Sequence, residues 1–324
     1  MKGIHRIVIQ NKKIKYDFEL KRNITVIRGN SATGKTALVD MIREYYENGE
    51  DSGIQLNCDK ECTVLEGRNW QAQLNLMTDC IVFIDEGNPF TSSKEFASAI
   101  QQTDNYYVIV TRERLGTLPY SVKEIYGIRN SGKYGRLNQT YNEFYNIYNL
   151  DSYEKEILPD IIMTEDSNSG YHFFDDVSKK YDLECISAEG KSNILKKMKD
   201  YQNKKVLIVA DGAAFGPEME RIVMQMNVQG NITLYLPESF EWMILKAGII
   251  KDSEVVDILA EPFNYIDGRE FFSWERFFTH VLIEKTSDTY LKYSKSLLNP
   301  VYLEDHIEKK ILDQFEIINL RWKI

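Results

Sequence analysis

The sequence predicts an α/β protein in which two units follow one another along the chain. Three observations lead to this expectation. The 324 residues exceed the length of one average domain. Short, fully apolar runs such as Cys80–Ile84 and Val206–Ala210 are typical of strands buried on both faces of a parallel sheet. Segments of helical periodicity alternate with these runs, and that alternation favours a parallel sheet covered by helices.

Composition and charge exclude several classes of protein. Hydrophobic residues make up 43% of the chain and charged residues 27%, which excludes a largely disordered protein. No run approaches about 18 apolar residues, so we expect no membrane span. The net charge of −9 disfavours a protein that coats duplex DNA through a broad basic face, although a local basic groove stays open.

The N-terminal residues and the cysteines bear on the expected location of the protein in the cell. Residues 1–6 lead into strand-like sequence rather than into the apolar core of a signal peptide. Cys58 and Cys62 lack a second Cys/His pair that would complete a tetrahedral zinc site. We therefore expect four reduced thiols in a cytoplasmic protein.

The first unit is expected to span residues 1–150. Alternating apolar residues predict two antiparallel strands before residue 21, and a fully apolar run predicts a buried strand that ends in a glycine loop. A helix and two central parallel strands follow. The aromatic residues between 141 and 148 have helical spacing and predict an amphipathic helix. The elements are strands Ile4–Ile9, Ile14–Leu20, Ile24–Ile27, Cys80–Ile84 and Tyr106–Val110, helix Ala37–Tyr46, and a helix carrying Tyr141, Phe144, Tyr145 and Tyr148.

The second unit is expected to span residues 151–324. Four strands alternate with helices, which again predicts a parallel sheet covered on both faces. From about Glu254 the chain is expected to be a mostly helical, aromatic-rich tail. The strands are Ile161–Met163, Leu183–Ser187, Val206–Ala210 and Ile232–Leu236, and the helices reach about Tyr181, span Ser192–Tyr201 and Pro217–Met226, and follow the last strand.

One motif predicts a phosphate-binding loop. The segment Gly29-Asn30-Ser31-Ala32-Thr33-Gly34-Lys35-Thr36 is a complete Walker A pattern, and it follows a predicted strand and opens a predicted helix. Glycines in such a loop let successive backbone N–H groups face a triphosphate. Lys35 is expected to contact the β- and γ-phosphates, and the Thr36 hydroxyl to bind Mg²⁺. The segment therefore predicts ATP and Mg²⁺ as ligands.

Acidic residues at the end of a second strand complete this prediction. Asp85 and Glu86 directly follow the apolar run Cys80–Ile84. We expect Asp85 to belong to the Mg²⁺ shell and Glu86 to activate the attacking water. Thr111, after the next strand, is a candidate contact to the γ-phosphate, and Arg112 or Arg114 is a candidate to act on a neighbouring copy.

Residues 1–130 resemble the ATPase heads of the ABC and structural-maintenance-of-chromosomes superfamily. The resemblance rests on the short strands before the loop and on Asp85-Glu86 at the strand end. About fifty residues separate the two motifs, no signature like Leu-Ser-Gly-Gly-Gln is present, and no histidine stands directly after the strand that ends at Val110. The resemblance therefore implies a compact P-loop ATPase of AAA-like or reduced ABC-like design.

Two strand ends in the second unit also carry carboxylates. Glu165 and Asp166 follow Ile161–Met163, and Asp211 follows Val206–Ala210. On one parallel sheet these carboxylates are expected to converge, and hard oxygen ligands suit Mg²⁺ or Mn²⁺.

This arrangement resembles the Toprim domain of topoisomerases, primases and OLD-family nucleases. In that resemblance Glu165 matches the family's glutamate and Asp211 matches the first aspartate of its Asp-x-Asp motif. Ala213 stands at the position of the second aspartate. Acids from the following segments are candidates to replace that ligand: Glu218, Glu220, Glu238 and Glu241.

The order of a P-loop ATPase and a Toprim-like domain resembles OLD-type nucleases and related bacterial anti-phage systems. It implies an ATPase whose nucleotide state gates a metal-dependent nuclease, with Lys35, Glu86, Glu165 and Asp211 as catalytic residues and nucleic acid as substrate. An alternative is a signalling protein in which ATP switches shape, contacts to a protein partner or assembly with further copies, and in which the second domain is catalytically degenerate. A nucleotide kinase is a third reading, with scattered lid candidates Arg112, Arg114, Arg129 and Arg136.

Two lysine-bearing segments are further candidates for contacts to phosphate. Lys191 stands at the start of a predicted helix, where a solvated lysine is the alternative. The stretch Lys292-Tyr293-Ser294-Lys295-Ser296 interleaves a tyrosine with lysines, as a nucleic-acid contact does.

Overall fold

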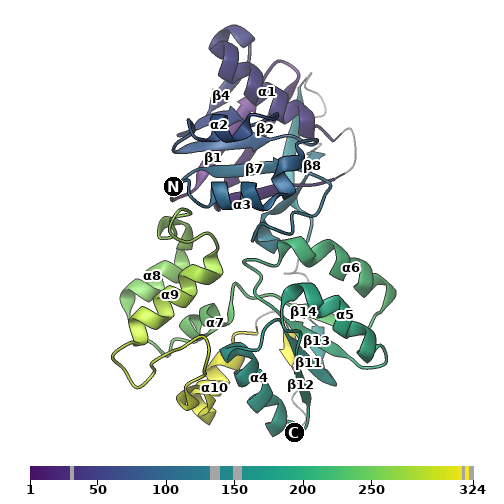
Figure 1. The fold of residues 1–324 in the computed structure, drawn as a ribbon, viewed down its shortest axis with the longest axis vertical. Helices are drawn as coiled ribbons and strands as arrows, with labels where there is room; N and C mark the ends of the chain where they lie inside the picture. Colours follow the sequence, from purple (N-terminus) through teal and green to yellow (C-terminus); the bar gives the residue numbers. More distant parts are fainter. Residues whose placement is uncertain (30–32, 132–138, 149–154, 316–317, 321–324) are drawn as a thin grey trace. The chain divides into compact units, whose positions relative to one another are not determined.

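The computed structural model describes residues 1–29, 33–131, 139–148, 155–315 and 318–320. It is an α/β protein that divides into two compact units (Figure 1). Unit 1 contains Met1–Tyr148 and Glu261–Phe272, and unit 2 contains Asn149–Ala260 and Ser273–Ile324. The predicted α/β class is confirmed.

The division of the chain differs from the predicted single boundary at residue 150, because Glu261–Phe272 belongs to unit 1. Backbone and side-chain hydrogen bonds fix this segment there. The amide of Gly3 donates to the Phe263 carbonyl over 2.8 Å, and Asn23 Nδ2 donates to the Phe272 carbonyl over 3.1 Å. These contacts join residues about 250 positions apart, which local sequence patterns do not encode.

Unit 1 is built on a nine-stranded mixed sheet with the order β4-β1-β2-β9-β8-β3-β7-β6-β5. The strands β8, β3, β7, β6 and β5 form a parallel block. Strands β1 and β2 pair antiparallel, as predicted, and β8 and β9 do the same. The bounds are β1 His5–Gln10, β2 Ile14–Leu20, β3 Ile24–Ile27, β4 Gln55–Asn57, β5 Glu61–Val64, β6 Cys80–Ile84, β7 Tyr106–Val110, β8 Ile125–Asn130 and β9 Thr140–Asn146.

The parallel block is buried on both faces. Alternate residues of β6 and β7, including Phe83 and Val108, join Leu38 of helix α1 (Lys35–Asn48) in one core. On the opposite face the ring of Tyr107 meets Phe96 of helix α3 (Lys94–Ile100), whose ring also contacts Trp70 of helix α2 (Trp70–Leu74). Burial on two faces explains why β6 and β7 have no polar alternation in the sequence.

The predicted helix around residues 141–148 is wrong, because Thr140–Asn146 forms strand β9. Its aromatic residues find partners on both faces of the sheet. The ring of Phe144 stacks on Phe18 at 4.1 Å, whereas Tyr145 lies beneath the guanidinium of Arg129. Cross-strand aromatic pairs of this kind stabilise sheets. The helical spacing in the sequence therefore arose from a strand that carries aromatic residues on two faces.

Unit 2 has a four-stranded sheet with the order β12-β11-β13-β14, and all its pairs are parallel, as predicted. The chain runs from the inner strand β11 out to β12 and then across to β13. The sequence order of the strands therefore reverses direction between β11 and β13. In open α/β sheets ligands bind at this switch point, beyond the carboxyl ends of the strands. The bounds are β11 Ile161–Thr164, β12 Glu184–Ser187, β13 Val206–Val209 and β14 Ile232–Tyr235.

Helices cover the sheet of unit 2, and the tail is mostly helical, as expected. Aromatic rings bind these layers together: Phe174 contacts Phe240 and Phe315, and the ring of Phe315 stacks on Tyr235 at 4.2 Å. The tail also contributes a strand that the sequence did not predict, because β15 pairs parallel with β10. The bounds are α4 Ser169–Lys180, α5 Ile194–Met198, α6 Met219–Val228, α7 Phe240–Lys246, α8 Ser253–Ala260, α9 Trp274–Thr286, α10 Asp305–Leu312, β10 Lys155–Ile157 and β15 Ile318–Leu320.

A search of the described residues finds no helix with the length and apolar character needed to cross a membrane.

Candidate functional site

The connection from β3 to α1 forms the first candidate site. Lys35 is the first residue of α1 and is only 4% exposed. Its Nζ donates hydrogen bonds to the carbonyl oxygen of Gly29, over 2.9 Å, and to Thr33 Oγ1, over 3.2 Å. The ammonium group therefore links Gly29, at the start of the loop, with Thr33, near its end. Asn30, Ser31 and Ala32, which the sequence predicted to contact nucleotide, lie outside the described residues.

Gly34 explains why the motif needs glycine immediately before the lysine. Its φ of 92° lies in the left-handed region, and a Cβ there would approach Tyr16 Oη to 2.8 Å. The same tyrosine hydroxyl donates to the Gly34 carbonyl over 2.7 Å. Strand β2 therefore fixes the start of α1 through a contact that only glycine permits.

Acidic residues from β6 face this loop. Strand β7 lies between β3 and β6, and the carboxyl ends of these parallel strands share one edge of the sheet. Asp85 and Glu86 follow β6 at that edge, and their charges act on Lys35. Seven residues line a pocket here: Thr33, Gly34, Lys35, Thr36, Ala37, Glu86 and Arg112. The structure thus brings together the predicted lysine, the predicted Mg²⁺-binding threonine and the predicted catalytic glutamate.

Burial and charge shift the pKa values at this site. Burial lowers the pKa of Lys35, and the neighbouring Arg112 adds to the effect, while Glu86 and Asp85 oppose it. Burial also raises the pKa of Asp85, whose Oδ1 accepts a hydrogen bond from the Glu86 amide over 2.8 Å. A doubly charged cation beside Asp85 would counter this loss of hydration.

The remaining predicted residues of unit 1 have distinct environments. Thr36 is exposed and lines the pocket. Thr111 is 6% exposed, and its hydroxyl accepts a hydrogen bond from the Glu113 amide over 2.9 Å. Arg112 forms an ion pair with Glu86, in which Nε and Oε1 are 2.7 Å apart. Arg136 lies outside the described residues.

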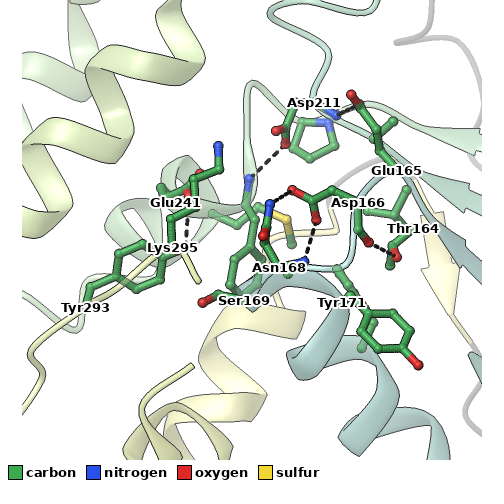
Figure 2. A pocket seen from close by; sticks show the side chains of 17 residues that line it. Thr164, Glu165, Asp166, Asn168, Ser169, Tyr171, Asp211, Glu241, Tyr293 and Lys295 are labelled. Carbon is green, nitrogen blue, oxygen red and sulfur yellow. Dashed lines mark hydrogen bonds between the residues drawn. The ribbon is translucent and has the colours of Figure 1, made fainter. Parts of the chain in front are cut away.

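The second candidate site lies at the switch point of unit 2. Glu165 follows β11, Asp211 follows β13, and the Asp211 amide donates to Glu165 Oε2 over 3.2 Å (Figure 2). Asp211 Oδ1 in turn accepts a hydrogen bond from the Phe240 amide at the start of α7, over 3.2 Å. The two residues that the sequence predicted to converge are therefore neighbours, joined through the backbone amide of Asp211.

Gly212 lets the chain turn between these elements. A Cβ at this position would approach the Leu236 carbonyl oxygen to 2.6 Å, and the Gly212 amide donates to the Pro237 carbonyl over 2.6 Å. The backbone after Asp211 therefore runs against the segment that follows β14. This close approach explains the Asp-Gly pair in the sequence.

The two carboxylates bind protons more tightly than exposed acids do. Burial raises the pKa of Glu165 to about 7, and Glu275 adds to this, whereas Lys191 works in the opposite direction. Burial also raises the pKa of Asp211 well above its usual range, and the charges of Glu275 and Glu165 contribute. Both shifts indicate that negative charge is costly in this buried pocket.

Helix α9 and the segment that follows it supply three polar residues that the sequence analysis did not place in this site. Lys295 lines the pocket, and its Nζ donates to Glu275 Oε1 over 2.5 Å. Tyr293 also lines the pocket and donates its hydroxyl to Glu241 Oε1 over 2.8 Å. Figure 2 shows Lys295 beside Glu241. The interleaved lysine and tyrosine were the signal in the sequence, but their place beside Asp211 depends on tertiary contacts.

Tertiary contacts also seat this segment. Ser169 at the start of α4 donates its amide to the Lys295 carbonyl over 2.9 Å and its hydroxyl to the Ser294 carbonyl over 2.6 Å. Burial lowers the pKa of Lys295, but Glu241, Glu275 and Asp211 outweigh burial and raise it overall. Lys295 is therefore a fixed positive charge in an acidic pocket.

The position that the Toprim resemblance assigns to a second aspartate is apolar and enclosed. Ala213 is 2% exposed, and its amide donates to the Glu238 carbonyl over 3.2 Å. Of the four acids considered as replacements, Glu241 lines the pocket. Lys191 donates its Nζ to the Ala214 carbonyl over 2.7 Å and contributes positive charge toward Glu165.

Within the described residues no group of three His, Cys, Asp or Glu side chains is arranged to hold a metal ion. Glu165 and Asp211 still fit Mg²⁺ or Mn²⁺ as a pair, since Mg²⁺ is commonly bound through one or two carboxylates and several waters. The backbone amides that bond Glu165 and Asp211 approach one oxygen of each carboxylate. Burial raises the pKa of both acids, and a cation held between them would offset that cost.

No family model matches the chain, and a search of curated proteins finds no matching relative.

Proposed function

We propose that unit 1 binds and hydrolyses ATP with Mg²⁺. The observation that carries this proposal is the position of Lys35, whose Nζ bonds the first residue of the loop while Glu86 and Arg112 line the same pocket. A buried ammonium group beside backbone amides at the start of a 14-residue helix is suited to bind a polyphosphate. Thr36 and Asp85 supply the oxygen atoms that would hold Mg²⁺.

Hydrolysis follows from the place of Glu86 at the end of β6. The oxygen of a water forms a bond to the γ-phosphorus, and the bond from that phosphorus to the β,γ-bridging oxygen breaks. The bridging oxygen leaves on ADP with the electron pair, and Glu86 accepts the proton of the water. Lys35 stabilises the charge that develops on the phosphate oxygens.

Lys35→Ala tests this function. We expect the variant to lose ATP binding and phosphate release, both measured with purified full-length protein. Lys21→Ala is a matched control, because Lys21 is an exposed lysine of unit 1 that pairs with Glu19 at 3.7 Å. Phosphate release by Lys35→Ala at the rate of the control would refute the assignment.

For unit 2 we propose a divalent-metal-dependent, nuclease-type site that the nucleotide state of unit 1 gates. The proposal rests on the contact between Glu165 and Asp211 at the switch point of a parallel sheet. These two residues would hold Mg²⁺ or Mn²⁺, which when bound polarises a phosphodiester and activates water. Lys295 supplies a positive charge for the phosphate oxygens.

Cleavage of single- and double-stranded DNA and of RNA, with and without ATP, tests the second site. We expect cleavage that needs Mg²⁺ or Mn²⁺ and is lost in Asp211→Ala. Wild-type protein that leaves all these substrates intact, while it still hydrolyses ATP, would refute the nuclease and retain the ATPase.

One observation favours a second candidate, an ATP-switched signalling protein whose unit 2 is catalytically degenerate. Ala213 places a buried methyl group where the Toprim resemblance expects a second aspartate. Lys295 places a positive charge in the pocket of the two carboxylates. In this candidate unit 2 recognises a protein partner or a further copy of the chain. Its signature is assembly that differs between ATP, ADP and no nucleotide, measured by the molecular mass in solution, without cleavage of nucleic acid.

A further inference from the structure

Arg112 and Glu86 form an ion pair in the wall of the Lys35 pocket. The guanidinium Nε and the carboxylate Oε1 are 2.7 Å apart, and the side chains are 53% and 36% exposed. Both residues line the pocket with Lys35 and Thr36. Arg112 comes from the end of β7 and Glu86 from the end of β6, so the pair bridges two neighbouring strand ends.

The two cations of this pocket differ in how they are positioned. Lys35 is 4% exposed and bonded to the loop carbonyl of Gly29, so its place is set before any ligand arrives. Arg112 is half exposed and is bonded to a carboxylate that solvent reaches. Exposed ion pairs of this kind contribute little to stability, so exchanging one for another costs little.

A bound triphosphate provides phosphate oxygens that could replace the Glu86 carboxylate as the partner of Arg112. A phosphate oxygen is at least as good an acceptor for a guanidinium as a carboxylate is, and charge-assisted hydrogen bonds to it are short and strong. The γ-phosphate is the part of ATP that ADP lacks. A pocket residue that bonds this group therefore distinguishes which nucleotide is bound.

We propose that Arg112 distinguishes nucleoside triphosphate from diphosphate by exchanging its ion pair with Glu86 for hydrogen bonds to the γ-phosphate. This inference rests on the proposed ATP site. The exchange has a second consequence, because it frees the Glu86 carboxylate to accept the proton of the attacking water. With ADP bound, or with the pocket empty, Arg112 stays on Glu86 and the carboxylate remains engaged.

Arg112→Met tests the proposal against a matched control. Arg6 forms an ion pair of the same kind with Asp17, with Nε and Oδ1 2.9 Å apart, between β1 and β2 of the same unit. Isothermal titration calorimetry gives the dissociation constants of the β,γ-imido analogue of ATP and of ADP for each variant. We expect Arg112→Met to weaken the ATP analogue at least about tenfold and ADP less than about twofold. Arg6→Met should leave both constants unchanged.

Glu86→Gln supplies the reciprocal measurement. It weakens the ion pair but leaves Arg112 in place, so the ATP analogue should bind at least as tightly as to the wild type, while phosphate release is lost. Equal loss of affinity for both nucleotides in Arg112→Met, or no loss for either, would overturn the proposal. Failure of the ATP site itself is recognised separately, because wild-type protein would then bind neither nucleotide and would match Lys35→Ala.

Discussion

The backbone amide of Asp211 donates a hydrogen bond to the carboxylate of Glu165 over 3.2 Å. This bond connects the ends of β13 and β11, which are neighbours in the sheet although 46 residues separate the two positions. The charge of Glu165 also raises the pKa of Asp211, and burial weakens the hydration of both carboxylates. Ionisation of both acids is therefore unfavourable, and protonation, a bound cation or a neutral substitution would reduce that cost.

Glu165→Gln should stabilise the protein at alkaline pH. The pKa of Glu165 is raised from 4.5 to about 7 in the folded state, so the folded protein binds more protons than the unfolded chain between these values. The free energy of unfolding consequently falls as the pH rises through that window. At pH 8 we expect the variant to gain about 2 kcal/mol, after a discount of the 1.36 kcal/mol per pKa unit for partial exposure.

Chemical denaturation at pH 5 and pH 8 measures this difference. Gln keeps an oxygen that accepts the Asp211 amide, so the hydrogen bond survives the substitution. The gain should shrink markedly at pH 5, where the Glu165 carboxyl is largely protonated. A gain of the same size at both pH values would show that charge is not its cause.

Mn²⁺ should raise the melting temperature of unit 2 at pH 8 by several degrees, since an ion that binds only the folded state stabilises it. The rise should fade as the pH drops below about 7, because protons then compete with the ion for Glu165. Asp211→Asn should abolish the rise while its amide oxygen still accepts the Phe240 amide.

Differential scanning calorimetry with and without Mn²⁺ follows this change. Asp200→Asn is the control, because Asp200 is exposed on the same unit. An equal Mn²⁺ effect in Asp211→Asn and in the control would place the ion elsewhere.

Gly34→Ala should destabilise unit 1 by about 2 kcal/mol and weaken ATP binding. The added methyl group would approach the Tyr16 hydroxyl to 2.8 Å, in addition to the strain of a φ of 92°. Gly53→Ala separates the two effects, because Gly53 also has a positive φ, of 70°, but open space around the Cβ position. Denaturation curves that show equal losses in both variants would mean that the contact with Tyr16 is unimportant.

Tyr293→Phe should destabilise unit 2 by about 2 kcal/mol. It removes the hydroxyl that donates to Glu241, a carboxylate that is 2% exposed and then loses one of its donors. Glu241→Gln in the same background should recover part of the loss, because a neutral amide tolerates burial better than a carboxylate. A double-mutant cycle measured by urea denaturation gives the coupling, and strict additivity would contradict a direct interaction.

Much of the fold follows from local patterns. Fully apolar runs predicted β6, β7, β11 and β13 because both faces of those strands are buried. Polar residues directly after such runs predicted that Glu165 and Asp211 meet at one sheet edge. These features depend on side-chain periodicity and on the parallel direction of neighbouring strands, and short stretches of sequence encode both.

Other features depended on contacts that local patterns do not contain. Strand β9 took the place of a predicted helix because its aromatic rings pack on both faces of a sheet formed by distant segments. Lys295 lies in the pocket of Asp211 because Ser169, more than a hundred residues earlier, donates hydrogen bonds to the backbone carbonyls of Ser294 and Lys295.

The sequence by itself therefore determined the α/β class, the loop that ends at Lys35 and the two acidic strand ends, because each is a short-range pattern of size, charge and conformational freedom. Only the tertiary structure decided that Glu261–Phe272 joins unit 1, that Arg112 engages Glu86 and that Lys295 enters the acidic pocket. The physical reason is that each of these contacts depends on the packing of segments that are far apart along the chain.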